Sequence, residues 1–160
     1  MRYTILAAIA DIYSPVLLLA IGLTIFQRPH KIKATAAVGF YMLGVYGTML
    51  FDQLTLLWPR AGLDYSTHTA FAAVCVRFLW RNVRGKVWRW IWPASLLVYL
   101  VLMRLQGYHS ILDMVTTLAA IAAWIAIQDF IWTKPPTLRN DNSNSNQTRA
   151  YGHDPHQDHR

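Results

Sequence analysis

Two histidines open apolar stretches of this 160-residue chain, and one of them is followed by an aspartate at helical spacing. His68 comes shortly after Ser66, and His109 stands four residues before Asp113. If a helix begins near His109, that spacing places both side chains on one face, where the carboxylate can hold one ring nitrogen and leave the other free. An imidazole held in this way can act as a base or a nucleophile. The spacing therefore predicts nucleophilic or acid–base chemistry around His109.

Two arginines lie close in sequence to these histidines. Arg104 comes five residues before His109, and Arg60 comes eight residues before His68. A guanidinium at such a place either reaches toward water from a helix end or binds the oxygens of a phosphate. His68 taken alone would be interpreted as a polar residue at a helix start. Taken together, the four side chains favour a phosphate site.

The composition excludes several other kinds of site. Glutamate is absent and Cys75 is the single cysteine, which excludes internal disulfides and the glutamate-dependent metalloprotease motif. Asp11, Asp52 and Asp64 are scattered along the chain, so no carboxylate cluster for Mg²⁺ is expected. We therefore expect chemistry without a metal or another cofactor. Asp11 and Asp52 either line the same cleft as the histidines or serve as packing partners.

The elements that must position these residues are long apolar runs in a chain that is 54% hydrophobic. The five runs are about Tyr3–Phe26, Thr35–Trp58, Thr67–Trp80, Val87–Leu105 and Ser110–Trp132. A helix needs ~20 residues to cross a hydrocarbon core of ~30 Å, and all runs but the short third one reach or approach that length. The sequence predicts an all-α, polytopic transmembrane helix bundle of about five spans within residues 1–133. Trp58 and other tryptophans near the span ends are expected to lie at the membrane interface.

The basic residues predict the orientation of this bundle. The net charge is +7, and twelve of the fifteen basic residues follow the first, third and fifth runs or lie around the ends of those runs. They are Arg28, Lys31, Lys33, Arg77, Arg81, Arg84, Lys86, Arg89, Lys134, Arg139, Arg149 and Arg160. The positive-inside rule makes these segments cytoplasmic and the N-terminus external. Such a distribution favours a membrane rather than nucleic acid as the partner, and it puts His68 and His109 on the outer side.

Residues 134–160 differ in composition from the rest of the chain. They are rich in proline, asparagine and serine and lack periodic apolar residues. Such a segment cannot bury enough apolar surface to fold. We expect it to be a disordered cytoplasmic tail, and its three histidines fit a polar tail better than a metal site.

The stretches around the two histidines resemble a pair of known motifs. Residues 65–71, Tyr-Ser-Thr-His-Thr-Ala-Phe, are similar to a Pro-Ser-Gly-His motif. Residues 104–113, Arg-Leu-Gln-Gly-Tyr-His-Ser-Ile-Leu-Asp, are similar to a Ser-Arg…His-x-x-x-Asp motif. Both motifs belong to the type 2 phosphatidic acid phosphatase superfamily. The resemblance covers the last three predicted spans.

The resemblance implies a role for each matching residue. His109 would attack phosphorus, Asp113 would orient it, and His68 would protonate the leaving group. Phosphate-binding residues on this interpretation are Arg104, Arg60 and Ser66. Departures from the family pattern include Tyr65 and Thr67 in place of proline and glycine, and the absence of the family's first motif, a lysine followed by Arg-Pro, from the external side.

The function implied by the resemblance is that of an integral membrane lipid phosphatase. With the orientation that the basic residues predict, we expect an outward-facing site in a multi-pass protein of a bacterial inner membrane. It would hydrolyse a lipid phosphomonoester or diphosphate through a phosphohistidine. The residues around His68 and His109 also resemble a sphingomyelin-synthase-like branch, whose members transfer a phospholipid headgroup. A catalytically inactive lipid-binding protein is a further alternative, and so is a haem protein with both histidines as axial ligands.

Overall fold

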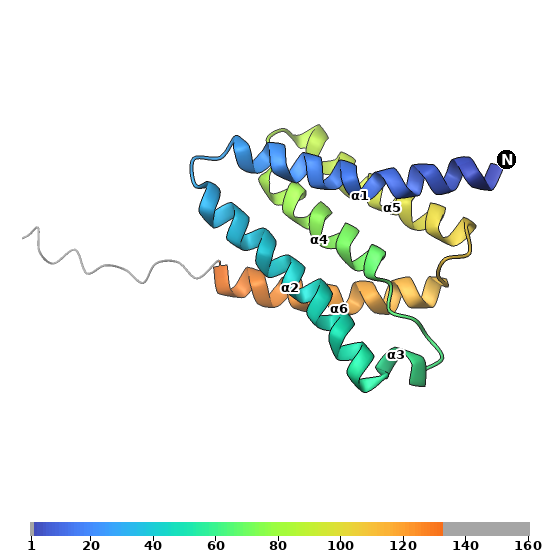
Figure 1. The fold of residues 1–160 in the computed structure, drawn as a ribbon. Helices are drawn as coiled ribbons and strands as arrows, with labels where there is room; N and C mark the ends of the chain where they lie inside the picture. The colour runs from blue at the N-terminus through green and yellow to red at the C-terminus, as the bar shows by residue number, and fades with distance from the viewer. Residues whose placement is uncertain (1, 133–160) are drawn as a thin grey trace, which may run out of the picture. The chain divides into compact units, whose positions relative to one another are not determined.

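Long apolar runs fold as helices in the computed structural model, which describes residues 2–132 (Figure 1). The elements are α1 (Arg2–Phe26), α2 (Lys31–Thr55), α3 (Leu57–Arg60), α4 (Thr67–Asn82), α5 (Lys86–Leu105) and α6 (Ile111–Trp132). No strand occurs within residues 2–132. The all-helical expectation is confirmed for this part of the chain, and the predicted tail at 134–160 lies outside it.

The chain divides into two units, Met1–Asp129 and Phe130–Arg160. Of the second unit, the structure describes only the last residues of α6. Every contact of the candidate site lies within the first unit.

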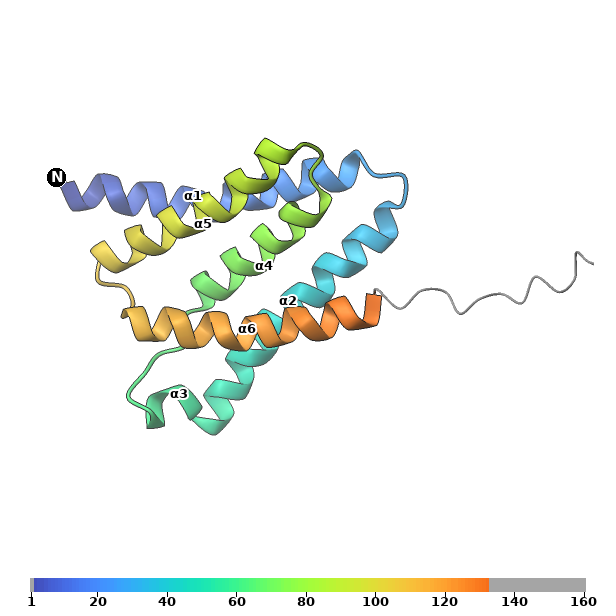
Figure 2. The same ribbon diagram turned by 180° about the vertical axis from the view of Figure 1, so that it is seen from behind.

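Helix α4 is the most deeply buried helix of the first unit, and it packs against α1, α2 and α5. Its buried residues are mainly small or branched: Thr69, Ala70, Ala72, Ala73, Val74, Cys75, Val76, Phe78 and Leu79. Small side chains allow neighbouring helices to approach closely. This central position, visible in Figures 1 and 2, explains why the shortest apolar run is also the one best shielded by other helices.

The connections between helices meet at two opposite ends of this unit. At one end the guanidinium of Arg28, after α1, donates to the backbone carbonyl of Asn82 at the end of α4. At the other end the backbone amide of Asp64, before α4, donates to Asp113 in the first turn of α6. The two histidines therefore lie at the end opposite to Arg28.

Helix α2 ends earlier than the second apolar run predicted. The chain leaves the helix at Leu56, whose φ of 54° is in the left-handed region, and then forms the short α3. The Asp52 carboxylate accepts a hydrogen bond from the Trp58 amide at 2.8 Å, so Asp52 holds α3 in place. Trp58 is only 8% exposed and is packed in the core, which corrects its predicted role as an interfacial anchor.

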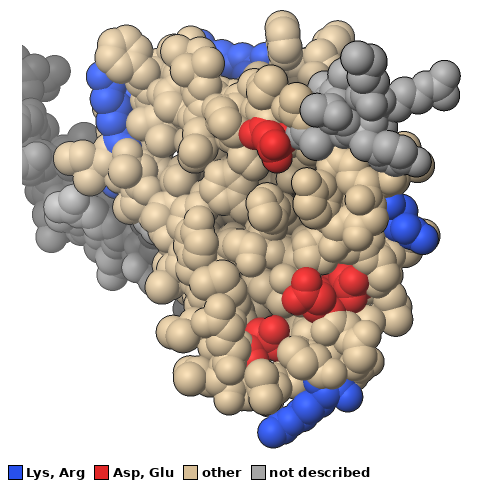
Figure 3. Space-filling model, turned by 45° about the vertical axis from the view of Figure 1, so that its right-hand side comes forward, with Lys and Arg blue, Asp and Glu red and all other residues tan. Residues whose placement is uncertain are grey.

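Within residues 2–132, two helices, Lys31–Thr55 and Ile111–Ile131, are long and apolar enough to cross a membrane, and Ala10–Phe26 forms a shorter apolar stretch. In the most apolar 18-residue stretch of each of these two helices, only 17% (Lys31–Thr55) and 28% (Ile111–Ile131) is buried. Large apolar side chains consequently face outward over much of the unit, among them Leu19, Leu43, Leu54, Leu97, Ile111 and Val115. Figure 3 shows one face on which uncharged residues dominate and charged side chains form small separate groups. A surface of this kind is typical of contact with lipid or with a partner.

Candidate active site

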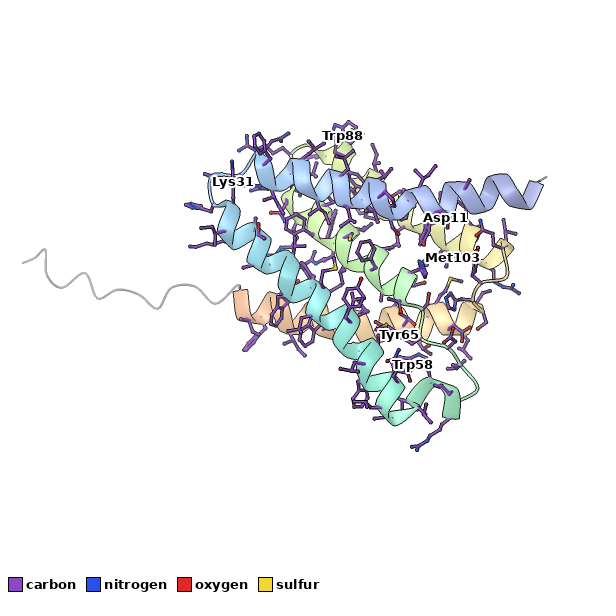
Figure 4. The ribbon with its side chains drawn as sticks, in the orientation of Figure 1. Asp11, Lys31, Trp58, Tyr65, Trp88 and Met103 are labelled. Atoms are coloured by element: carbon purple, nitrogen blue, oxygen red, sulfur yellow. The ribbon has the colours of Figure 1, made fainter. Side chains whose placement is uncertain are left out.

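A cavity of about 530 Å³ brings the two predicted histidines together. Its described lining comes from α1, α4, α5 and the connection between α5 and α6: Ala10, Asp11, Ser14, His68, Tyr99, Met103, Tyr108 and His109. Asp11 on α1 and Met103 on α5 lie at the same end of the unit in Figure 4. Asp11 therefore lines the same cavity as the histidines. The sequence had left open whether it would do so or serve as a packing partner.

His109 lies just before α6 and not on it. The helix begins at Ile111, so the condition for stacking His109 on Asp113 within one helix is not met. The His109 Nδ1 atom is buried and makes no hydrogen bond to the described residues. The carboxylate near it is Asp64, whose Oδ2 lies 3.4 Å from Nδ1, a distance longer than a hydrogen bond but within ion-pair range.

Asp113 instead binds the backbone of both connections. Its Oδ1 accepts from the Asp64 amide at 2.9 Å, and its Oδ2 accepts from the Ser110 amide at 2.8 Å. The Ser110 hydroxyl in turn accepts from the Asp113 amide at 3.1 Å, which is the reciprocal pattern of a capping box. Asp113 therefore fixes the segment that carries Asp64 beside the segment that carries His109.

Ser66 has a structural position at the start of α4. It is fully buried, and its hydroxyl accepts from the Thr69 amide as the N-cap of the helix. Its own amide donates to Thr117 Oγ1 on α6 at 3.0 Å. These contacts hold the first turn of α4, and with it His68, against α6.

The residue before Ser66 ties the same segment to α2. The Tyr65 hydroxyl donates to the carbonyl of Val45 at 3.0 Å, and its ring packs edge-on against Trp58. Burial raises the pKa of the Tyr65 phenol, which therefore remains a hydrogen-bond donor at neutral pH. Trp58 Nε1 in turn donates to Thr116 on α6 at 3.0 Å. Figure 4 shows Tyr65 and Trp58 close together beside the lower half of α2.

The two predicted arginines lie near this end but are not among the described residues that line the cavity. Arg104 is exposed in the last turn of α5 and follows the lining residue Met103. Arg60 is exposed at the end of α3. The structure therefore brings His68 and His109 into one cavity and leaves both guanidinium groups at the surface.

No protein-family model, curated protein or solved structure matches this chain. The site must consequently be interpreted from its own geometry.

Sequence reasoning missed the position of Asp64, because only the hydrogen bonds of Asp113 reveal that its loop reaches His109. Tyr99 and Tyr108 were missed as well, since aromatic residues in apolar runs carry no distinct signal. Among the described residues, no group of three or more His, Cys, Asp or Glu side chains could hold a metal ion.

A second, smaller cavity adjoins the first. Its volume is about 280 Å³, and it shares Ser14 and His68 with the larger cavity. The remaining lining is largely apolar or aromatic, including Leu18, Tyr46 and Phe71. His68 thus stands where the cavity with two imidazoles meets a more apolar one between α1, α2 and α4.

Proposed function

We propose that this protein is a membrane-embedded phosphotransferase that hydrolyses lipid phosphates through a phosphohistidine on His109. The observation that carries the proposal is the shared cavity of His68 and His109, with the Asp64 carboxylate 3.4 Å from one ring nitrogen of His109. Two imidazoles and a carboxylate can supply a nucleophile, a proton donor and an orienting charge. The motif resemblance of residues 65–71 and 104–113 adds support from the sequence.

The proposed reaction has two steps. The Asp64 carboxylate favours the proton on Nδ1 of His109, which leaves the lone pair of Nε2 for attack on phosphorus. The bond between phosphorus and the leaving oxygen breaks, and His68 gives its proton to the departing alkoxide. His68 then takes a proton from water, and the oxygen of that water displaces His109 and releases phosphate. An alcohol in place of water would give headgroup transfer, the alternative within the same chemistry.

Charge on the phosphoryl oxygens needs stabilisation. Arg104 is our candidate for this role. It comes directly after Met103, which lines the cavity, and its own side chain is exposed. The positive end of the α4 helix dipole would add to this effect, since a helix N-terminus favours anions. Arg60, exposed at the end of α3, would serve as a second phosphate contact.

The substrate class is a lipid phosphate. The smaller cavity beside His68 is lined by Leu18, Tyr46 and Phe71 and offers apolar space for a hydrocarbon chain. Outward-facing apolar side chains on α2 and α6 support placement of the protein in a bilayer. We further propose five spans formed by α1, α2, α4, α5 and α6, with the histidine end outside a bacterial inner membrane, on the basis of the distribution of basic residues.

The decisive experiment traps the intermediate. Purified protein is incubated with a ³²P-labelled lipid phosphate, and acid-labile protein-bound phosphate is measured for wild type and for His109→Ala. We expect the label and turnover to disappear in His109→Ala. The matched control is His30→Ala, which removes an exposed histidine before α2 and should change neither. Folded His109→Ala protein that still turns over would refute the proposal.

The same assay separates the two histidines. His68→Ala should slow turnover about 10²–10⁴-fold with poor leaving groups, and much less with aryl phosphates, which depart without a proton.

The absorption spectrum of the purified protein tests the haem alternative, because a Soret band would support histidine ligation of haem. A folded protein without label, turnover or Soret band would favour the non-catalytic lipid-binding alternative.

A further inference from the structure

A separate cavity lies at the end of the first unit opposite to the histidines. Its volume is about 410 Å³, and its described lining comes from the end of α1, the end of α4, the connection between α4 and α5, and the first turn of α5. Two guanidinium groups, those of Arg28 and Arg84, are part of this lining, together with Gln27, Asn82 and Trp88. The proposed reaction uses none of these residues.

The charge around this cavity is of one sign. No acidic side chain is among its described lining residues. Asp129, an acidic residue of α6, forms ion pairs with Arg77 and Arg81. The cavity thus combines two cations with neutral hydrogen-bonding groups, which is the donor set that binds phosphate oxygens.

One of the two guanidinium groups is held in position. Arg28 Nη2 donates to the backbone carbonyl of Asn82, and the other N–H groups of an arginine remain available to a ligand. Arg84 is exposed and makes no hydrogen bond or ion pair with the described residues, so its side chain is free to close on an anion. The Asn82 side chain donates to the Phe78 carbonyl at 2.8 Å, which holds this lining residue in position.

The surroundings of the cavity are apolar as well as basic. Trp88, in its lining, is 57% exposed, and the neighbouring Val87 and Trp90 are exposed too. Figure 4 shows Trp88 and Lys31 at this end of the unit, away from Asp11 and Met103. A ligand with an anionic group and a hydrocarbon part would satisfy both features.

We propose that this cavity binds the phosphate group of an anionic phospholipid in the leaflet at the basic end of the protein. Basic pockets between helices at the cytoplasmic side of a membrane are suited to such headgroups. This inference rests on the membrane placement proposed above but not on the proposed catalysis. The lipid is a structural or regulatory ligand there, since the histidines lie at the other end.

The test uses the full chain in detergent and counts bound lipids by native mass spectrometry. The probes are phosphatidylglycerol, diacylglycerol with the same acyl chains, and inorganic phosphate. We expect phosphatidylglycerol to bind and diacylglycerol not to bind. Arg84→Gln should weaken phosphatidylglycerol binding by about fivefold, the order expected for one charge-assisted contact at a partly solvated site. The matched control Lys33→Gln removes an exposed charge outside the described lining and should change binding less than about twofold.

Equal losses in Arg84→Gln and Lys33→Gln would overturn the proposal, because general surface charge would then explain the binding. Binding of diacylglycerol as strong as that of phosphatidylglycerol would also overturn it. If inorganic phosphate gave the whole Arg84-dependent effect and lipid added nothing, the site would be one for free phosphate and the lipid proposal would fail. Labelling of His109 is measured on the same samples, so that a failed lipid site and a failed catalytic proposal are distinguished.

Discussion

Asp64 and Asp113 have different surroundings, although Asp64 is close to His109 in space and Asp113 is close to it in sequence. Asp113 is buried and accepts hydrogen bonds from two backbone amides, whereas Asp64 is 71% exposed and faces the Nδ1 atom of His109. A buried carboxylate with backbone donors maintains a fold, and an exposed carboxylate beside an imidazole is free to influence its tautomer. We therefore assign the orienting role to Asp64 and a positioning role to Asp113.

This assignment predicts unequal effects of two similar substitutions. Asp64→Asn should lower kcat about 10–100-fold at nearly unchanged KM, because the amide no longer favours the proton on Nδ1 and cannot stabilise imidazolium charge. The unfolding temperature should stay close to that of wild type, since the Asp64 side chain is largely exposed. Steady-state kinetics and thermal unfolding in detergent measure both quantities.

Asp113→Ala serves as the comparison. It removes the acceptor of two part-buried hydrogen bonds, those from the Asp64 and Ser110 amides, and a hydrogen bond to a charged group contributes about 1.5–3 kcal/mol. A marked loss of stability is expected in addition to any loss of rate. If Asp113→Ala were as stable as wild type while Asp64→Asn retained full kcat, our assignment of the two roles would be wrong.

At the scale of elements, α2 and α6 pack through a glycine and a tryptophan. A Cβ atom at Gly44 would lie 2.1 Å from the indole of Trp124. That indole is stacked on Phe40 and donates to its carbonyl at 3.1 Å, so it cannot turn aside without losing both contacts. Gln128 continues the contact by donating to the Ala37 carbonyl. The packing of Trp124 on α2 therefore requires glycine at position 44.

Gly44→Ala tests this packing. We expect it to destabilise the protein by about 1–3 kcal/mol, the usual cost of inserting a methyl group into a close-packed contact. Gly47→Ala, one turn along the same helix, has open space at the Cβ position and should be neutral or slightly stabilising because alanine favours helix. Thermal unfolding in detergent compares the two. Equal stability of both variants would mean that α2 and α6 do not pack closely at Gly44.

The positions of the long helices could be predicted from sequence because apolar runs carry that information over many residues. The break at Leu56 could not, since a leucine in the left-handed region has no local signal and depends on the Asp52 carboxylate holding Trp58. The Asp64–His109 approach depends on pairing of two loops far apart in sequence. Neighbours along the chain therefore suggested Asp113 as the partner of His109.

At the scale of the whole molecule, the uneven distribution of basic residues predicts an orientation for the proposed membrane placement. A cysteine at Ala61, exposed after α3, should react with an impermeant maleimide added to intact cells, and a cysteine at Lys33 should react only after permeabilisation. Cys75 is fully buried and should give little background. A reporter fused after Arg149 should be active in the cytoplasm. The reverse labelling pattern would place both histidines at the inner face.

Contacts between α4 and α6 have a consequence for the order of events during synthesis. The Ser66 amide binds Thr117, 51 residues later, and Asp64 binds Asp113, 49 residues later. A ribosome makes the segment with His68 well before it makes the helix that must hold it. Until α6 has emerged, the start of α4 lacks these partners. The start of α4, which carries His68, is thus held in place only once α6 has been made.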